Sequence, residues 1–145
     1  GSEMCIRDRA FAGMPGYMHE ALLAAYLQTA AHRPLSDEAL KIYSTPWLGA
    51  VGQPAFYRQI AQMSTRYTDE VQDLYQPMEC PVTVLWGEND AWIPAEKGHE
   101  LAKLISKRPC ILVPGSGHLM QEDRPEAIVA AVLGRAAFLC NSLGH

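Results

Sequence analysis

The apolar residues of this 145-residue chain follow two patterns, which change near residue 70. In the first part, apolar residues recur near one face of a helix. This spacing predicts three helices, over residues 17–31, 36–43 and 54–66. Ser36 is the expected N-cap of the second helix, and Pro54 is expected to open the third at its first position. No strand is predicted between the three helices, so this part resembles a helical layer more than a sheet.

After residue 77 the pattern changes to strand, helix, strand, helix. Residues 81–86 and 110–113 are apolar runs without clear alternation, which predicts strands buried on both faces. Helices are expected over residues 94–107 and from Pro125 onward. A strand, a crossover helix and a second strand imply parallel pairing with a right-handed connection. Because two strands are too few for a doubly covered sheet, we expect the rest of the sheet to lie upstream of this chain.

Composition and charge narrow the class of protein. The net charge is −4, with 48% hydrophobic and 19% charged residues, which excludes a disordered acidic tail or a basic nucleic-acid arm. The longest apolar runs have about seven residues, and a membrane span needs about 20. We therefore expect neither nucleic acid nor membrane as a partner. Away from residues 1–9, three cysteines without Cys-x-x-Cys spacing are expected to be buried thiols of a reducing, cytoplasmic compartment: Cys80, Cys110 and Cys140.

The first nine residues are expected to have a different origin from the rest of the chain. Back-translation of residues 1–8 gives, codon for codon, the end of a common transposon-based sequencing adapter. An expression tag would explain Gly1 and Ser2 but would leave Met4 to Asp8 unexplained. We therefore expect residues 1–9 to be a non-native, adapter-derived leader, and we exclude them from the fold. We also expect the natural protein to continue upstream of this chain, which leaves its true N-terminus out of view.

Two side chains with chemical potential follow the predicted strands. Asp90 comes shortly after the first strand and His118 shortly after the second, so both are expected at the same rim of the sheet, where open α/β sheets bind ligands. A carboxylate that accepts the Nδ1 proton of an imidazole leaves Nε2 to act as a general base. Taken singly, an Asp in a Gly-x-x-Asp turn is more often a turn former, and a lone His more often has no catalytic role.

Residues 78–139 resemble the C-terminal segment of the α/β-hydrolase fold superfamily. The run from Cys80 to Asp90 is similar to the strand and turn that carry the acid of the catalytic triad, and Val113 to His118 is similar to the strand and turn that carry the histidine. The resemblance implies that Asp90 is the acid, with Glu88 as a nearby rival, and that His118 is the base. It also implies a helical cap over residues 10–70, a core over residues 71–145, a small-molecule substrate and no cofactor.

The chain departs from the family in two respects: it has no Gly-x-Ser-x-Gly elbow or relative to carry the nucleophile, and it has no oxyanion-hole loop. We expect the nucleophile upstream, and we expect this chain alone to be inactive. A Ser nucleophile would imply hydrolysis of a small ester or lactone, and an Asp nucleophile an epoxide hydrolase or haloalkane dehalogenase. A non-catalytic binding member of the superfamily and an unrelated flavodoxin-like half-domain remain the alternatives from other classes.

Weaker signals concern substrate and metal binding. Trp47 and Trp92 are candidate substrate-binding residues, although aromatic residues on short helices more often belong to the core. His99 and Glu100 begin like the zinc motif His-Glu-x-x-His, but Lys103 stands where the second ligand would be. No metal site is therefore predicted.

Overall fold

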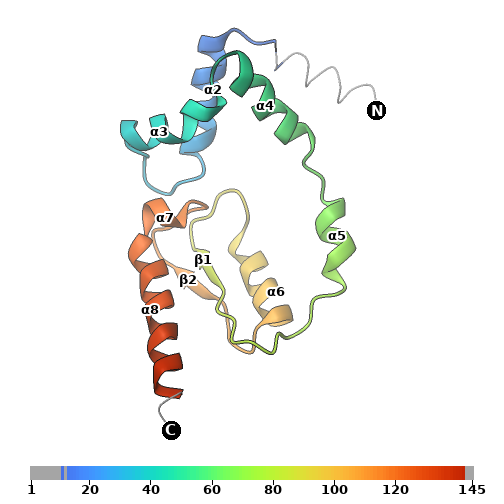
Figure 1. The fold of residues 1–145 in the computed structure, drawn as a ribbon, viewed down its shortest axis with the longest axis vertical. Helices are drawn as coiled ribbons and strands as arrows, with labels where there is room; N and C mark the ends of the chain where they lie inside the picture. The colour runs from blue at the N-terminus through green and yellow to red at the C-terminus, as the bar shows by residue number, and fades with distance from the viewer. Residues whose placement is uncertain (1–10, 12, 143–145) are drawn as a thin grey trace. The chain divides into compact units, whose positions relative to one another are not determined.

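The computed structural model describes residue 11 and residues 13–142, with side chains up to residue 134 (Figure 1). The predicted leader over residues 1–9 lies outside the described residues. The chain forms two compact units. The first contains the residues up to 28 together with residues 35–74, and the second contains residues 29–34 together with the residues from 75 onward.

The described part of the first unit contains helices and no strand. Its elements are α2 (Gly16–Gln28), α3 (Asp37–Ser44), the 3₁₀ helix η1 (Thr45–Trp47), α4 (Gly49–Ala61) and α5 (Arg66–Gln72). The predicted N-cap is confirmed, because the Ser36 hydroxyl accepts a hydrogen bond from the backbone N–H of Ala39 at 3.2 Å. Two carboxylates, Asp37 and Glu38, lie in the first turn of α3, where they interact favourably with the helix dipole.

Three predicted helix boundaries in this unit are wrong. The third helix begins at Gly49, with Pro54 inside it, and ends at Ala61, before the separate helix α5. Gly52 explains the early start, because it lets α4 pack directly on η1: a Cβ at Gly52 would lie 2.5 Å from the carbonyl oxygen of Pro46. The first helix, α2, ends at Gln28 and not at residue 31.

The core of the first unit surrounds a buried histidine. His19 is completely buried, and its Nε2 lies 2.9 Å from the carbonyl oxygen of Trp47. Because that carbonyl can only accept, Nε2 carries the proton and Nδ1 accepts from the hydroxyl of Tyr57 at 3.0 Å. Leu23 and Phe56 complete the buried cluster. Both ring nitrogens of His19 are thus used in holding α2, η1 and α4 together.

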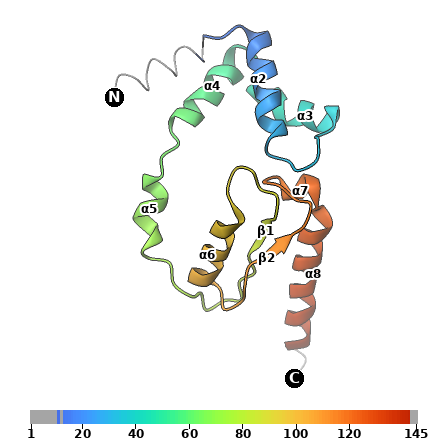
Figure 2. The same ribbon diagram turned by 180° about the vertical axis from the view of Figure 1, so that it is seen from behind.

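The second unit is an α/β arrangement. Its elements are β1 (Leu85–Gly87), α6 (Ala95–Ile105), β2 (Ile111–Val113), α7 (Met120–Asp123) and α8 (Pro125–Ser142). The two strands pair in parallel, with Trp86 opposite Leu112, which confirms the predicted pairing. Figures 1 and 2 show the strands side by side, flanked by α6 and α8. The α/β fold class, with two parallel strands and flanking helices after a helical segment, is confirmed.

The strands differ from the prediction in length and burial. The first covers three residues, Leu85–Gly87, and not residues 81–86; the second covers Ile111–Val113 and not residues 110–113. The second strand is also not buried on both faces, since Ile111 is half exposed, whereas no residue of β1 is exposed. The short helix α7, which lies between the loop that carries His118 and α8, was not predicted.

A small core joins α6 to the strands. Val84, Ala102 and Cys110 are buried together, and Gly98 brings α6 against the ring of Trp86, where an added Cβ would lie 2.7 Å from a ring carbon. Cys110 is a buried free thiol, as predicted, but Cys80 is exposed. Cys80 lies before β1 on a segment whose residues are exposed. The prediction that Cys80 is a buried thiol is therefore wrong.

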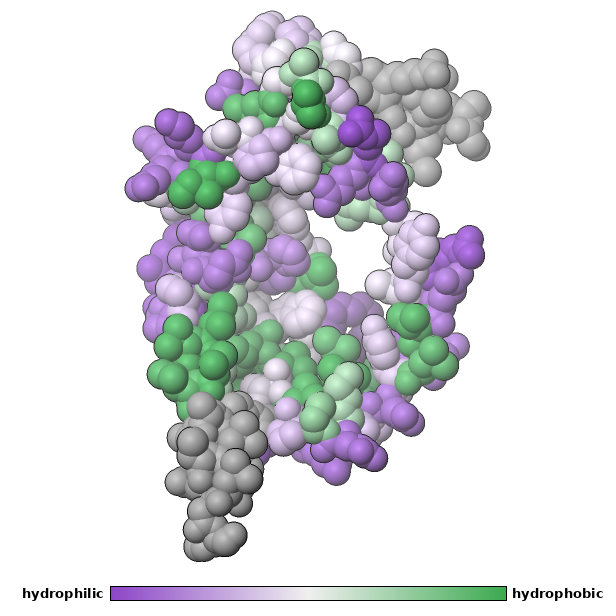
Figure 3. Space-filling model, in the orientation of Figure 1, coloured by the Kyte–Doolittle hydropathy of each residue, from purple (hydrophilic) through white to green (hydrophobic). Residues whose placement is uncertain are grey.

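One side of α8 exposes apolar side chains. Val129, Val132 and Leu133 are 54%, 63% and 62% exposed, and Figure 3 shows a hydrophobic patch over this helix. Such a patch is unusual for an isolated soluble domain. Of the helices described, none is long and apolar enough to cross a membrane.

The exposed face of α8 and the short sheet predict that the 145-residue chain alone does not fold cooperatively. Each strand has one described strand neighbour, so each leaves an edge that invites association. Thermal unfolding followed by circular dichroism should show a broad, non-cooperative transition, and size-exclusion chromatography should show aggregation. A monodisperse monomer with a sharp transition would contradict this prediction.

Candidate active site

The turn after β1 fixes the carboxylate of Asp90 with backbone donors. Its Oδ1 accepts hydrogen bonds from the N–H groups of Trp92 and Ile93, both at 2.9 Å. An aspartate that accepts from residues two and three positions ahead closes a local turn. The side chain of Asp90 is only 5% exposed. Its second oxygen, Oδ2, is therefore presented in one direction by a carboxylate that the backbone holds.

That second oxygen contacts His118. The distance from His118 Nδ1 to Asp90 Oδ2 is 3.0 Å, and the imidazole is 33% exposed. Because a carboxylate only accepts hydrogen bonds, Nδ1 carries the proton and Nε2 is the acceptor for a further group. Glu88, the rival carboxylate, is exposed. The structure thus brings Asp90 and His118 together at the carboxyl ends of the two strands.

The turn after β1, which carries Asp90, and the loop after β2, which carries His118 and is called the histidine loop below, are also joined through their backbones. The N–H of Glu88 donates to the carbonyl of Val113 at 3.1 Å, and the N–H of Asn89 donates to the carbonyl of Ser116 at 2.9 Å. The side-chain oxygen of Asn89 accepts from the N–H of Gly115 at 3.1 Å. These bonds continue the pairing of the strands beyond their ends, so the two loops are joined to each other and to the sheet.

Two glycines allow this close contact. A Cβ on Gly87, at the end of β1, would overlap the carbonyl oxygen of Gly117. A Cβ on Gly117 would lie 2.8 Å from the backbone nitrogen of His32 and 2.9 Å from the carbonyl oxygen of Ala30. Because these neighbours are backbone atoms, no side-chain rotation relieves the overlap. Both positions therefore require glycine for steric reasons.

The environment of Asp90 acts on its pKa in two directions. Burial raises the pKa, because it removes water from the charged form. Hydrogen bonds from the N–H of Ile93, the ring of His118 and the N–H of Trp92 stabilise the carboxylate and outweigh the burial, so the pKa of Asp90 lies below its usual value. The group that faces His118 is thus an ionised carboxylate at neutral pH.

The two tryptophans predicted to bind substrate lie in different units. The ring of Trp92 lies against His118, with ring centroids 4.9 Å apart and planes inclined by 33°. Its Nε1 donates to the hydroxyl of Thr29 at 3.0 Å. Trp47 belongs to the first unit, where its ring contacts Phe56. Trp92 is thus next to the candidate pair, and substrate binding by either tryptophan stays a prediction.

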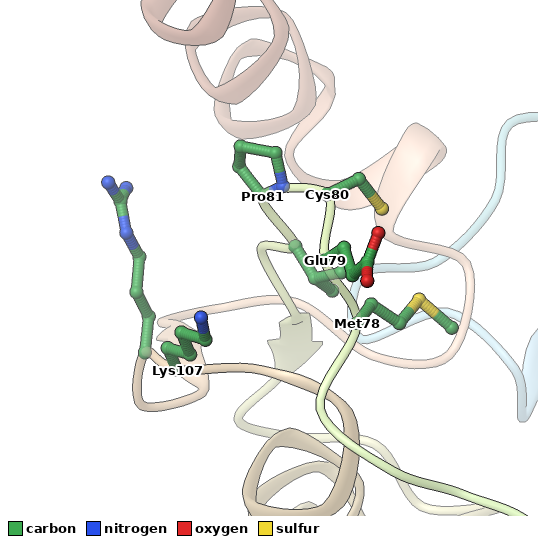
Figure 4. A pocket seen from close by; sticks show the side chains of 7 residues that line it. Met78, Glu79, Cys80, Pro81 and Lys107 are labelled. Carbon is green, nitrogen blue, oxygen red and sulfur yellow. The ribbon is translucent and has the colours of Figure 1, made fainter.

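A cavity of about 260 Å³ lies at the pair. It is lined by β1, by Gly117 and Met120, and by Asp90 and His118. A second cavity, of about 280 Å³, lies at the amino ends of the strands and is lined by residues such as Glu79 and Lys107 (Figure 4). Only the first contains the pair.

No group of three or more potential metal ligands gathers among the described residues. The residue that the sequence reasoning missed is Asp123, at the end of α7. Its side chain is buried and accepts hydrogen bonds from the backbone N–H groups of His32, Arg33 and Gly117. No periodicity or spacing signals such a role, because two of the donors lie about ninety positions away in sequence.

Comparison of the sequence with known proteins identifies a family. Residues 5–131 match the model of the "Alpha/beta hydrolase family". The chain belongs to the α/β hydrolase family. Asp90 and His118, which the sequence analysis predicts as acid and base, lie within this match and at hydrogen-bonding distance from one another; their roles stay a prediction.

The matches to solved and curated relatives cover only part of each relative's own length. A crystal structure of an α/β hydrolase fold protein from Burkholderia ambifaria is 52% identical, with a TM-score of 0.87 over 91% of this chain and 49% of that chain. A thermophilic esterase from Thermogutta terrifontis shares the fold at 20% identity, with a TM-score of 0.54 over 94% of this chain and 51% of its own. The uncharacterized hydrolase YugF of Bacillus subtilis (strain 168) is 26% identical over 114 residues, 75% of this chain and 39% of its own. The chain thus spans about half the length of the solved relatives.

Substitution of Gly117 tests the close backbone contact. In the full-length gene product that contains this chain, we expect Gly117→Ala to lower the free energy of unfolding by about 1–3 kcal/mol, because the added methyl meets backbone atoms. Gly16→Ala is the matched control, since nothing lies within 4 Å of its added Cβ; at the start of α2 it should leave stability unchanged or raise it by up to about 1 kcal/mol. Urea unfolding measures both, and equal effects would contradict the steric argument.

The lowered pKa of Asp90 predicts an acid-dependent loss of stability. The pKa of Asp90 in the folded state lies below its unfolded value of about 3.9. The contribution of Asp90 to the free energy of unfolding is therefore fully present above the unfolded pKa and is lost as the pH falls through the folded pKa. Urea unfolding of the full-length gene product between pH 7 and pH 3 should show this loss. Asp90→Asn should reduce it and Glu88→Gln should not; equal pH profiles for wild type and Asp90→Asn would refute the assignment.

Proposed function

We propose that the full-length gene product is a hydrolase that cleaves a small ester, lactone or related small molecule. His118, oriented by Asp90, serves as the general base for a nucleophile that lies outside this chain. The observation that carries the proposal is the 3.0 Å contact between these two side chains, at the rim of two parallel strands and beside a cavity. Membership of the α/β hydrolase family and the esterase among the solved relatives support it.

The proposed chemistry with a Ser nucleophile runs through an acyl intermediate. Nε2 of His118 takes the hydroxyl proton as the oxygen bonds to the carbonyl carbon of the substrate, and then returns that proton to the leaving alkoxide. Water attacks the acyl-enzyme with the same base assisting, which releases the acid and restores the Ser. Throughout, Asp90 holds the Nδ1 proton and stabilises the imidazolium without taking the proton itself.

An Asp nucleophile would give a different reaction with the same pair. Its carboxylate would displace a halide or open an epoxide, forming an ester on the enzyme, and His118 would activate the water that hydrolyses this ester. The nucleophile therefore decides between an esterase and an epoxide hydrolase or dehalogenase. In either case the 145-residue chain alone has no turnover, because it lacks the elbow that carries the nucleophile.

Recovery of the upstream coding sequence is the first test. A Ser, Asp or Cys at a strand-to-helix elbow supports the proposal and selects the substrates to assay: p-nitrophenyl esters for Ser or Cys, and haloalkanes and epoxides for Asp. An elbow that carries none of these residues would favour a non-catalytic binding protein and would overturn the proposal.

Substitution of the pair is the second test, in the full-length gene product. We expect His118→Ala and Asp90→Asn each to lower kcat by about 10⁴-fold, because the first removes the base and the second removes the charge that fixes its tautomer. Glu88→Gln is the control, since it removes an exposed carboxylate two positions from Asp90 and should change kcat by less than about threefold. Steady-state kinetics on the substrate selected above would reject the assignment if His118→Ala kept wild-type activity.

A further inference from the structure

Asp123 is a buried carboxylate whose hydrogen bonds all go to the backbone. Asp123 is only 3% exposed. Oδ2 accepts from the N–H groups of His32 and Gly117, both at 2.8 Å, and Oδ1 accepts from the N–H of Arg33 at 2.9 Å. A buried carboxylate is costly unless it is hydrogen-bonded or paired, and these three donors, together with the charge interaction with His32, stabilise it here.

The three donors lie on two segments that meet at His118. Gly117 immediately precedes His118, and His32 and Arg33 belong to residues 29–33, which we call the clasp segment. On the other side of His118, the N–H of Leu119 donates to the carbonyl of Ala30 at 3.0 Å. The residues directly before and after His118 are therefore both tied to the clasp segment, one through Asp123 and one directly.

The clasp segment also holds the ring that lies on His118. Its first residue, Thr29, accepts the hydrogen bond from Nε1 of Trp92, and Trp92 lies against the imidazole. The same short segment thus fixes the backbone on both sides of His118 and one face of its ring. Asp123 is the only side chain among these contacts that bonds both the clasp segment and the histidine loop.

We propose that Asp123 is a positioning residue for His118: by binding the clasp segment to Gly117, it sets the direction in which Nε2 points. The proposal rests on the hydrolase function proposed above for its kinetic consequence. Asp90 fixes the rotation of the imidazole through Nδ1, whereas Asp123 fixes the loop from which the imidazole extends. A shift of this loop would leave the base intact but misaligned with the nucleophile.

The test compares substitutions at Asp123 with a neighbouring carboxylate, in the full-length gene product. Asp123→Asn places an amide NH₂ where a backbone N–H now finds an acceptor. Asp123→Glu keeps the charge and displaces it by one methylene. Glu122→Gln is the matched control, since it removes an exposed carboxylate from the same helix. Readouts are kcat and KM, the downfield proton resonance of His118 Nδ1, and hydrogen exchange at the amides of Gly117, His32 and Arg33.

We expect Asp123→Asn to lower kcat by about 10-fold to 100-fold, the range expected for misplacement of a catalytic group by up to about an ångström. KM should change by less than about threefold, the Nδ1 resonance should broaden or shift, and the three amides should exchange faster. Asp123→Glu should have a smaller effect of the same kind. Glu122→Gln should match wild type in all readouts.

Each outcome decides the proposal. A folded Asp123 variant whose three amides lose protection while kcat and the Nδ1 resonance stay at wild-type values would overturn it. If loss of folding is the only effect that any substitution at Asp123 produces, its role is merely structural and the proposal is also overturned. If wild type hydrolyses none of the assayed substrates, the proposed function fails, and the Nδ1 resonance and amide exchange still decide whether Asp123 positions His118.

Discussion

Three stretches of backbone lie against one another without side chains between them, and the position of His118 depends on this contact. The end of β1 at Gly87 meets the carbonyl of Gly117, and the other side of Gly117 meets the backbone of residues 30–32. Contact between backbones leaves no rotamers to adjust, and close-packed interiors transmit displacement directly. Placement of the histidine loop is therefore set by the sheet on one side and by the clasp segment on the other.

Two aspartates orient the imidazole of His118, one by direct contact with the ring and one through the backbone of its loop. Asp90 gives one oxygen to backbone N–H groups and the other to His118, whereas Asp123 gives both oxygens to the backbone. Hydrogen bonds to a charged group contribute about 1.5–3 kcal/mol each, enough together to offset the desolvation of a carboxylate. The hydrogen bonds also lower the pKa of Asp123, against the rise that burial alone causes. Both groups thus stay ionised at neutral pH and keep accepting these bonds.

The sequence predicted the features that depend on local pattern and on topology. Apolar runs separated by a helix predicted parallel strands, and topology then brought Asp90 and His118 to one rim, although they are 28 positions apart. The start of α4 was not predictable in this way, because it depends on how closely Gly52 approaches η1. Asp123 was missed for a related reason: its donors are brought to it by the tertiary fold from distant parts of the chain, and nothing near residue 123 indicates them.

The orientation of the His118 imidazole is set by residues of this chain. The Nδ1 partner, the ring that lies on the imidazole and the bonds on either side of His118 all come from the second unit. A base that is held before substrate arrives needs little reorganisation during the reaction. In the proposed function, this arrangement serves a Ser and an Asp nucleophile equally, because both reactions need Nε2 as a proton acceptor. The difference between an esterase and a dehalogenase therefore lies in the nucleophile and not in the pair described here.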